Sequence, residues 1–429
     1  MIDDTLRKIK RFIPRNVFVF FQPAYHYLLA LGGALLYRFP SREITVIAIT
    51  GTKGKTTTSE YVNAILEAAG KKTALSSTLR FKIGDNSRPN MYKMSLPGRF
   101  FLQQFLRQEV DAGCTHAIIE ITSEAAKQYR HKFTSLDVLL FTNLTPEHIE
   151  SHGSFEQYAD AKLSIGRALV ASSKRPRIMI ANTDDAYGQR FLALGTDITI
   201  PYSMADTTNI EDSDRGVAFT SRGTRFTIAT KGHFNVANAL AAIGYARAIG
   251  VTDETIAHGL SSLSLIRGRM EHIDAGQDFT VIVDYAHTPE SLEAAYGAYP
   301  NTRKICVLGS AGGGRDTGKR PRMGEIANTY CTHIILTDED PYDEDPAKIV
   351  ADVRAGITTT PCEIIMDRRV AIARALSLAQ TGDAVYITGK GTDPYIMGRN
   401  GTKTPWDDII VAREELTTFL SSHTQSTSL

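Results

Sequence analysis

The chain has 429 residues, of which 42% are hydrophobic and 22% are charged, and its formal net charge is +1. This length predicts two or three domains, and the composition is typical of a globular protein. The balanced charge gives no reason to expect a nucleic-acid partner. The four cysteines form no C-x-x-C pair. This spacing argues against a structural zinc site or a disulfide framework and fits a reducing cytoplasm.

The N-terminal segment is apolar and aromatic over residues 16–39 and follows a basic stretch. No A-x-A-like cleavage site follows it, which argues against a signal peptide. Polar residues and a proline interrupt the run, and its cleaner part, 27–37, is too short for a transmembrane helix. Two alternatives stay open: a helix packed on the body of the protein, or an interfacial helix on the inner face of a membrane.

Apolar, β-rich runs alternate with helical patterns through the first half of the chain. Runs that are apolar throughout are typical of strands buried on both faces of a parallel sheet. A helical segment between them, 59–70, ends in a glycine that can cap it. This alternation predicts a doubly wound α/β domain. The four strands expected here are 43–50, 115–121, 137–144 and 177–183.

The pattern restarts after residues 266–268 with buried strands that end in glycine or acidic residues. Ligands bind at the carboxyl ends of such strands, so we expect a second α/β unit with its own binding loops. Residues 203–230 predict a β-hairpin inserted in the first domain, and the polar tail from Ser421 is expected to be disordered. The strands expected in the second unit are 279–286, 304–310, 333–340 and 383–391.

The segment from Gly51 to Thr56, GTKGKT, follows a strand and opens a helix. This is the context of a phosphate-binding loop, although Ile49 stands where the usual G-x-x-x-x-G-K-[ST] pattern has its first glycine. Backbone amides at the helix N-terminus would hold phosphate oxygens, and Lys55 would neutralise the terminal phosphates. The alternative is a glycine-rich turn before an ordinary helix.

Polar side chains near strand ends and helix starts are further candidates, and each has a structural alternative. Glu120 ends a strand, where it is either a solvated carboxylate or an oxygen ligand for Mg²⁺. His148 and His152 are four residues apart, which fits a metal site only weakly and two surface histidines equally well. Asn235 opens an alanine-rich helix, where its carboxamide either caps the helix or binds the adenine edge.

The second unit carries cations and polar groups in three loops. Arg267 and Arg269 lie at the domain junction, and Asp284 and His287 end a strand. A glycine-rich loop, 308–327, places three cations beside three consecutive glycines, which suits an anionic ligand. The alternative is a solvated basic loop. These three cations are Arg315, Lys319 and Arg320.

Taken in chain order, these motifs resemble those of the Mur ligase family, and most closely its tripeptide-synthetase (MurE-like) branch. The resemblance runs from Ile44 to Glu415, and eight motifs in family order make a chance match implausible. The motifs are GTKGKTTT, EITSEAAKQYR, TNLTPEHIESHGSFEQYADAK, GHFNVANALAA, GRME, VDYAHTPESL, GSAGGGRDTGKRPRMG and GKGTDPY.

The resemblance implies a central P-loop ATPase domain with a mostly parallel sheet, over 44–265, and a C-terminal Rossmann-like α/β domain, over 266–420. Residues 1–43 would form a short apolar and basic segment, and 421–429 a disordered tail. The short loop is the family's own variant, so Ile49 does not count against a nucleotide site.

The resemblance also implies a role for each matching residue. Lys162 would be carbamoylated, because CO₂ turns a neutral amine into an anionic oxygen donor that suits Mg²⁺. The implied catalytic residues are Lys55, Glu120, His148 and Lys162, and two Mg²⁺ ions would bind Thr56, Glu120, His148 and Lys162. ATP would contact Gly51, Thr52, Lys53, Gly54, Lys55, Thr56, Thr57, Asn235, Arg269 and Asp284. Substrates would contact Ser123, Arg130, His287, Arg315, Lys319, Asp338, Asp340, Tyr342, Gly389, Lys390 and Asp393.

The implied reaction is ATP-dependent amide formation. An acceptor carboxylate attacks the γ-phosphate to give an acyl phosphate, and the amine of an amino acid then displaces phosphate. The two domains are expected to close about a hinge near Ile266. The expected partners are small molecules, a nucleotide-sugar peptide and an amino acid, and no nucleic acid. The protein is expected to be a cytoplasmic monomer, with the inner face of the membrane as an alternative contact of 16–39.

Three departures from the family pattern leave the substrates open. The N-terminal segment, about 43 residues, is far shorter than the domain with which the family holds the uridine diphosphate. The motif DEDPYDED has Asp340 for asparagine and Tyr342 where arginine is common, which favours an amino acid with a cationic side chain, such as lysine or ornithine. Thr392 and Asp393 stand where His-Glu is common, and Glu124 stands where histidine is common.

Three functions are therefore weighed. The first is addition of a diamino acid to UDP-N-acetylmuramoyl-L-Ala-D-Glu in peptidoglycan precursor synthesis. The second is a ligase of the same fold with another acceptor: a folate, a polymer end or a lipid-linked peptide. The third is a nucleotide-binding module without catalysis, which the complete predicted metal set argues against.

Overall fold

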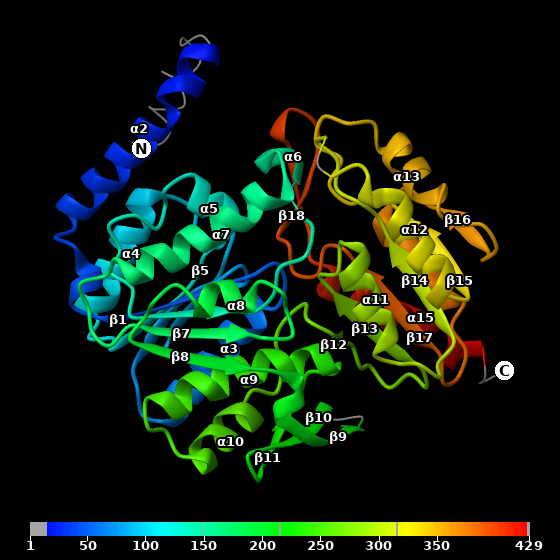
Figure 1. Ribbon diagram of the computed structural model, residues 1–429. Helices are drawn as coiled ribbons and strands as arrows, with labels where there is room; N and C mark the ends of the chain where they lie inside the picture. The colour runs from blue at the N-terminus through cyan, green and yellow to red at the C-terminus, as the bar shows by residue number, and fades with distance from the viewer. Residues whose placement is uncertain (1–14, 148, 214–215, 315, 427–429) are drawn as a thin grey trace. The chain divides into compact units, whose positions relative to one another are not determined.

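The computed structural model describes residues 15–147, 149–213, 216–314 and 316–426, and side chains only between 21 and 422 within those ranges. The chain divides into two compact units, each with its own sheet (Figure 1). The first unit is Met1–Leu144, Glu156–Tyr202 and Ala241–Gly250, and the second is Thr145–Phe155, Ser203–Leu240 and Val251–Leu429.

The first unit is built on an eight-stranded sheet in the order β4-β3-β2-β5-β1-β6-β7-β8. The strands from β2 across to β8 are parallel, and β3 and β4 add an antiparallel edge. All four strands predicted in this half are present, because their apolar residues are buried on both faces. The strands are β1 (Thr45–Thr50), β2 (Thr73–Ser76), β3 (Arg80–Ile83), β4 (Asn86–Pro89), β5 (His116–Glu120), β6 (Val138–Phe141), β7 (Ile178–Asn182) and β8 (Ile198–Tyr202).

Helices cover both faces of this sheet. The chain leaves β1 toward β2 through α3 and leaves β6 toward β7 through α7, so right-handed crossovers place these helices on opposite faces, as Figure 1 shows. The predicted helix 59–70 is confirmed and begins earlier, at Lys55. The helices are α3 (Lys55–Ala68), α4 (Arg99–Asp111), α5 (Ser123–Lys127), α7 (Phe155–Val170) and α8 (Gly188–Leu192), preceded by α2 (Arg15–Leu36) and the 3-10 turn η1 (Pro40–Arg42).

The N-terminal helix α2 packs against α4 through one of its faces. Ala30 and Ala34 are buried there, and the His26 ring hydrogen-bonds to the guanidinium of Arg99. The first of the two alternatives for this segment, a helix packed on the body, is therefore confirmed for the described residues. Within the described part of the chain, no helix is long and apolar enough to span a membrane.

The second unit contains a six-stranded sheet in the order β12-β13-β17-β14-β15-β16, parallel except for β12. Alternate residues of each strand face two separate apolar cores: α11, α12 and α13 cover one face, and α14 and α15 cover the other. The four predicted strands are confirmed. The strands are β12 (Glu271–His272), β13 (Thr280–Asp284), β14 (Lys304–Leu308), β15 (His333–Leu336), β16 (Cys362–Ile364) and β17 (Ala384–Thr388), with the separate pair β18 (Tyr395–Met397) and β19 (Lys403–Pro405).

Two predictions for this half need correction. Residues 203–230 form a three-stranded antiparallel sheet rather than a hairpin: β9 (Thr207–Ser213), β10 (Gly216–Ser221) and β11 (Thr224–Ile228). The tail predicted as disordered from Ser421 continues α15 (Asp408–Ser426). The helix is anchored by buried Leu416, and the Ser421 hydroxyl donates to the carbonyl of Thr417 at 2.8 Å, so the polar residues extend it. Residues 427–429 lie outside the described part.

The remaining helices are α6 (Ile149–His152), α9 (His233–Ala248), α10 (Asp253–Ser262), α11 (Pro289–Gly297), α12 (Lys319–Tyr330), α13 (Pro346–Arg354) and α14 (Arg368–Ser377), with the 3-10 turns η2 (Met204–Asp206) and η3 (Arg399–Gly401).

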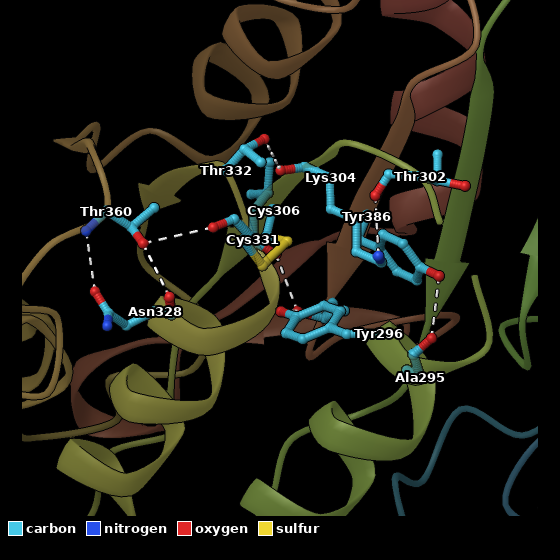
Figure 2. The surroundings of a disulfide bond; sticks show 12 residues. Ala295, Tyr296, Thr302, Lys304, Cys306, Asn328, Cys331, Thr332, Thr360 and Tyr386 are labelled. Carbon is cyan, nitrogen blue, oxygen red and sulfur yellow. Dashed lines mark hydrogen bonds between the residues drawn. A yellow bond between two sulfur atoms is a disulfide. The ribbon is translucent and has the colours of Figure 1, made fainter. Parts of the chain in front are cut away.

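Cys306 in β14 and Cys331 after α12 form a disulfide, with their Cα atoms 6.1 Å apart (Figure 2). The cysteine spacing predicted no disulfide framework, and for this pair that prediction is wrong. The two residues are 25 positions apart in sequence and meet because α12 packs on the face of the sheet to which Cys306 contributes. Both are buried, beside Tyr296 and Tyr386. Cys114 and Cys362 are free cysteines.

Candidate active site

The loop between β1 and α3 forms a cradle at the N-terminus of the helix. Gly51 passes so close to Thr142 that a Cβ atom there would lie 1.9 Å from the threonine hydroxyl oxygen. Gly54 caps α3 with φ of 81°, and no side chain caps the helix. The Lys55 ammonium donates to the carbonyl oxygens of Gly51 and Thr52 at 2.9 and 2.8 Å. A positive helix end, a loop with glycines that lets the backbone approach closely, and a lysine are what phosphate binding requires.

Residues after β6 and on α7 hold this loop in place. The amides of Thr52 and Lys53 donate to the backbone and side-chain oxygens of Asn143, each at 2.8 Å. The Tyr158 hydroxyl hydrogen-bonds to the Thr52 hydroxyl at 2.8 Å. Sequence reasoning missed Asn143 and Tyr158. Their only signal was their place in the polar motif after β6.

Lys162 reaches the same loop from α7. Its side chain is 2% exposed, and its ammonium donates to the Gly51 carbonyl at 2.6 Å and lies 4.8 Å from the centre of the Tyr158 ring. Lysine is almost never fully buried unless it has a specific partner, so Lys162 is not an ordinary lysine of a helix surface. The structure therefore brings Lys55 and Lys162 to the same loop carbonyl.

Glu120 is the carboxylate side chain of the predicted metal set. It is fully buried at the end of β5, and its carboxylate accepts hydrogen bonds from the amide and the hydroxyl of Thr78 at 3.2 and 3.0 Å. The solvated alternative is therefore wrong. Thr56 is buried in the first turn of α3, and His148 lies outside the described residues.

The unmodified side chains of the predicted metal set supply only some of the oxygen ligands that Mg²⁺ needs. Among the side chains that the structure describes, no three His, Cys, Asp or Glu residues gather as metal ligands. The predicted set contains just two such residues, Glu120 and His148, and draws its other oxygens from the Thr56 hydroxyl and a carbamate on Lys162. Oxygen donors of this kind are what Mg²⁺ takes.

The predicted adenine, phosphate and ribose contacts lie in the second unit. Asn235 is 1% exposed; its amide nitrogen donates to the carbonyl of Lys231 at 2.7 Å, and its oxygen accepts from Asn238 at 3.1 Å. It is the third residue of α9, so it does not cap the helix. The Arg269 guanidinium lies 4.6 Å from the ring centre of Tyr285.

Asp284 ends β13 and is held by two backbone amides. Its carboxylate oxygens accept from Met270 and Ala286, each at 2.8 Å. Two residues on, His287 donates from Nδ1 to the Tyr285 carbonyl at 2.7 Å. Both side chains are thereby oriented at the carboxyl end of a parallel strand, where ligands bind in such sheets.

The three cations of the glycine-rich loop before α12 differ in what is known of their surroundings. The Lys319 ammonium donates to the carbonyl of His287 at 2.9 Å, and Arg315 lies outside the described residues. Arg320 is fully buried and pairs with Glu344 at 2.6 Å and Asp352 at 2.9 Å. A role for Arg320 in binding an anionic ligand is therefore wrong, because its charge is already neutralised inside the fold.

Part of the negative charge in the acidic motif after β15 is neutralised by a buried lysine, which the sequence of the motif does not indicate. Lys390 follows β17 and is fully buried; its ammonium donates to Asp340 at 2.8 Å, to the carbonyl of Tyr395 at 2.6 Å and to Asp393 at 3.4 Å. Asp340 also accepts from the amide of Met397 at 2.8 Å. Asp340, Lys390 and Asp393, all predicted as substrate contacts, thus form one buried cluster.

Five other predicted substrate residues lie near this cluster or in the first unit. Gly389 directly precedes Lys390, and the Tyr342 amide donates to the carbonyl of Met397 at 2.9 Å. Burial raises the pKa of the half-buried Asp338. In the first unit, buried Ser123 begins α5, and Arg130 donates to Gln128 at 2.8 Å and to the carbonyl of Leu96.

Burial also raises the pKa of Glu339, to about 7 from 4.5, and one of its carboxylate oxygens has no hydrogen-bond partner. Between these pH values the folded protein keeps a proton that the unfolded chain has lost. The free energy of unfolding should therefore fall as pH rises from about 4.5 to about 7, by about 3 kcal/mol for this group. We expect Glu339→Gln to remove this part of the pH dependence in urea unfolding.

Glu254→Gln, at an exposed position of α10, is the control and should keep the parent pH profile. A Glu339→Gln profile that superimposes on that of the parent protein would show that the carboxyl is ionised throughout this range.

These observations define the class of protein: an α/β enzyme with a phosphate loop and a buried lysine beside it. The family descriptions "Mur ligase middle domain" and "Mur ligase, glutamate ligase domain" match residues 49–246 and 268–391. The chain belongs to the Mur ligase family and is MurE-like. It is accordingly an ATP-dependent ligase that forms amide bonds in peptidoglycan precursor synthesis, and its family uses ATP and Mg²⁺.

The relatives span most of the chain. A UDP-N-acetylmuramyl-tripeptide synthetase of Roseiflexus sp. is 38% identical, over 90% of this chain and 81% of that protein. A UDP-N-acetylmuramoyl-L-alanyl-D-glutamate–2,6-diaminopimelate ligase of Bacillus cereus is 36% identical, over 92% and 82%. A solved structure of a ligase with that same name is 29% identical, with a TM-score of 0.59 over 87% and 78%.

One further solved structure shares the fold alone. The Mycobacterium tuberculosis folylpolyglutamate synthase is 15% identical, with a TM-score of 0.68 over 84% of this chain and 92% of that one. The predicted fold class is therefore confirmed. The individual site residues, and the domain limits at 43, 265 and 420, stay predictions.

Proposed function

We propose that the protein adds a diamino acid, such as L-lysine, to UDP-N-acetylmuramoyl-L-alanyl-D-glutamate through an acyl phosphate. The observation that carries this proposal is the cluster in which Lys55 and Lys162 share the carbonyl of Gly51. A buried lysine at a phosphate loop gives a position where a carbamate could hold Mg²⁺, and the charge of the metal would offset that of the phosphates during phosphoryl transfer. Names of similar proteins support the acceptor and a diamino acid.

The chain's own residues have distinct tasks in this proposal. The cradle of Gly51–Thr56 holds the terminal phosphates, and Lys55 neutralises them. Thr56, Glu120, His148 and carbamoylated Lys162 would hold two Mg²⁺ ions, which supply further positive charge when bound. Positioning and electrostatics, rather than acid–base chemistry, would then account for most of the rate.

The side chain of the incoming amino acid is proposed from the motif after β15. Tyr342 stands where an arginine would pair with the second carboxylate of diaminopimelate, so a lysine or ornithine side chain fits better. Burial of Asp340 against Lys390 removes one carboxylate from this selection. The half-buried Asp338 is then the carboxyl group of the motif with the best claim to a cation, because Glu339 is buried and burial raises its pKa to about 7.

A panel of amino acids with the UDP-linked dipeptide tests the proposal by phosphate release. We expect lysine or ornithine to support release at least about tenfold faster than diaminopimelate, alanine or glutamate. Fastest release with an acidic or neutral amino acid would refute the cationic side chain. No release with any amino acid would refute the acceptor, and Lys162→Ala protein sets the background rate.

A lipid-linked peptide is the second candidate acceptor. The apolar side chains exposed along α2 favour it, because they would keep the protein close to such a substrate. We propose that either reaction takes place in the cytoplasm, because it uses ATP. The monomeric state stays a prediction.

A further inference from the structure

An open cleft of about 720 Å³ lies in the second unit, between α15 and residues 267–271, which lead into β12. This volume is within the range of small-molecule sites in proteins, about 300–1,000 Å³. On α15, the lining residues Ile410, Arg413 and Thr417 follow one another at three and four positions, so they share one side of the helix. Ile409 beside them is 5% exposed and belongs to the core underneath. We call this feature the α15 cleft.

Two arginines line the α15 cleft, and both keep N–H donors that the fold does not use. Arg413 donates one N–H to the carbonyl of Asp274 at 3.2 Å and forms no ion pair with any carboxylate of the described residues. Arg267 is 48% exposed and donates to Asp407 at 2.9 Å. Since a guanidinium carries several N–H donors, most donors of these two side chains are available to a ligand.

The carboxyl groups that line the same cleft do not neutralise Arg413. Glu414 pairs with Arg369 at 2.8 Å. Glu271 is 5% exposed and accepts from the amide of Gly268 at 2.8 Å. Burial raises the pKa of Glu271, although the charges of both arginines act against this rise. The charge of Arg413 is therefore left without a close counter-ion, and the cleft favours an anion.

The α15 cleft borders two predicted ATP contacts without including them. Arg267 and Glu271 line it, whereas Arg269 between them and Asp284 do not. The Met270 amide donates to Asp284 at 2.8 Å, so this segment is held to the strand that carries the predicted ribose contact. A ligand in the cleft would accordingly occupy a site of its own.

We propose that the α15 cleft binds a small organic anion that carries an apolar group. The anion would accept hydrogen bonds from Arg413 and Arg267, and the apolar group would lie on Ile409 and Ile410. Carboxylates and phosphate monoesters both match a guanidinium, so they share the chemistry that this site recognises. The proposal goes beyond the ligase function and does not depend on it.

Titration calorimetry of the full chain tests this proposal with benzoate and phenyl phosphate as probes. Saturating ATP and Mg²⁺ are present throughout, so that neither probe reports on the phosphate loop. We expect saturable binding of at least one probe. Tighter binding of one of them supports the proposal and identifies the preferred anionic group. Benzyl alcohol lacks the charge and inorganic phosphate lacks the apolar group, and each should bind at least about tenfold more weakly.

Variants of the cleft locate the bound probe. Arg413→Gln should weaken binding at least about tenfold, because it removes the guanidinium. Ile410→Gln, at a side chain that is 53% exposed, should weaken binding as well, since it removes apolar contact. The matched control is Arg222→Gln, at an exposed arginine between β10 and β11, and it should bind as the parent does.

Two results would overturn the proposal. One is a parent protein that binds neither benzoate nor phenyl phosphate. The other is equal binding by the parent, Arg413→Gln and Ile410→Gln, because the probe would then lie elsewhere. An active ligase that binds neither probe refutes only this inference, and an inactive protein that binds one in the cleft refutes only the proposed function.

Discussion

Replacing Lys162 by alanine is expected to lower the rate of phosphate release about 10²–10³-fold. The lysine is buried against Gly51 and Tyr158, so the change removes an anionic oxygen donor from the phosphate loop if the side chain carries a carbamate. The carbamate forms when the neutral amine attacks the carbon of CO₂ and loses one proton. Phosphate release at saturating ATP and amino acid measures the loss.

Three measurements separate this role from a structural one. Lys71→Ala, at an exposed lysine of the same unit, should keep the parent rate. Acetate should restore part of the Lys162→Ala activity, because it can place a carboxylate in the space left by the side chain. Protein supplied with ¹³C-bicarbonate should give a carbamate carbon signal that Lys162→Ala lacks. Unchanged turnover in Lys162→Ala would refute the assigned role.

Replacing Arg368 by methionine is expected to lower the free energy of unfolding by about 3–5 kcal/mol. Arg368 opens α14 and is 1% exposed; its guanidinium donates to both oxygens of Asp408, at 2.8 and 2.7 Å. It also donates to the carbonyl of Thr388 at 2.8 Å. Without it, the fully buried carboxylate of Asp408 keeps only weaker partners, such as the indole N–H of Trp406.

The neighbouring arginine provides a matched control. Arg369 is 44% exposed and pairs with Glu414 and Glu415 at the surface, so Arg369→Met should cost less than about 1 kcal/mol. Guanidinium unfolding of both variants measures the contrast. Arg368→Met/Asp408→Asn should be less destabilised than Arg368→Met, because no buried charge is left alone. Similar losses in Arg368→Met and Arg369→Met would contradict this account of the pair.

The sequence by itself determined the two sheets and the phosphate loop. Strands buried on both faces of a parallel sheet are apolar throughout, so all eight predicted runs stand out locally and all eight are strands. The loop is equally local, since its glycines, Lys55 and Thr56 follow one strand and open one helix. Eight ordered motifs then identified the family.

Only the tertiary structure decided which charged side chains are neutralised by a partner inside the fold. Asp340 and Lys390 are 50 residues apart in sequence and meet inside the second unit, and Arg320 is neutralised by Glu344 from another loop. The disulfide between Cys306 and Cys331 depends on where distant segments pack. The same is true of α15, which continues to Ser426. Pairing between distant segments leaves no periodic trace in a sequence, because it depends on where the folded chain returns. Local patterns therefore predicted the elements, and packing determined which of their charged side chains are paired inside the fold.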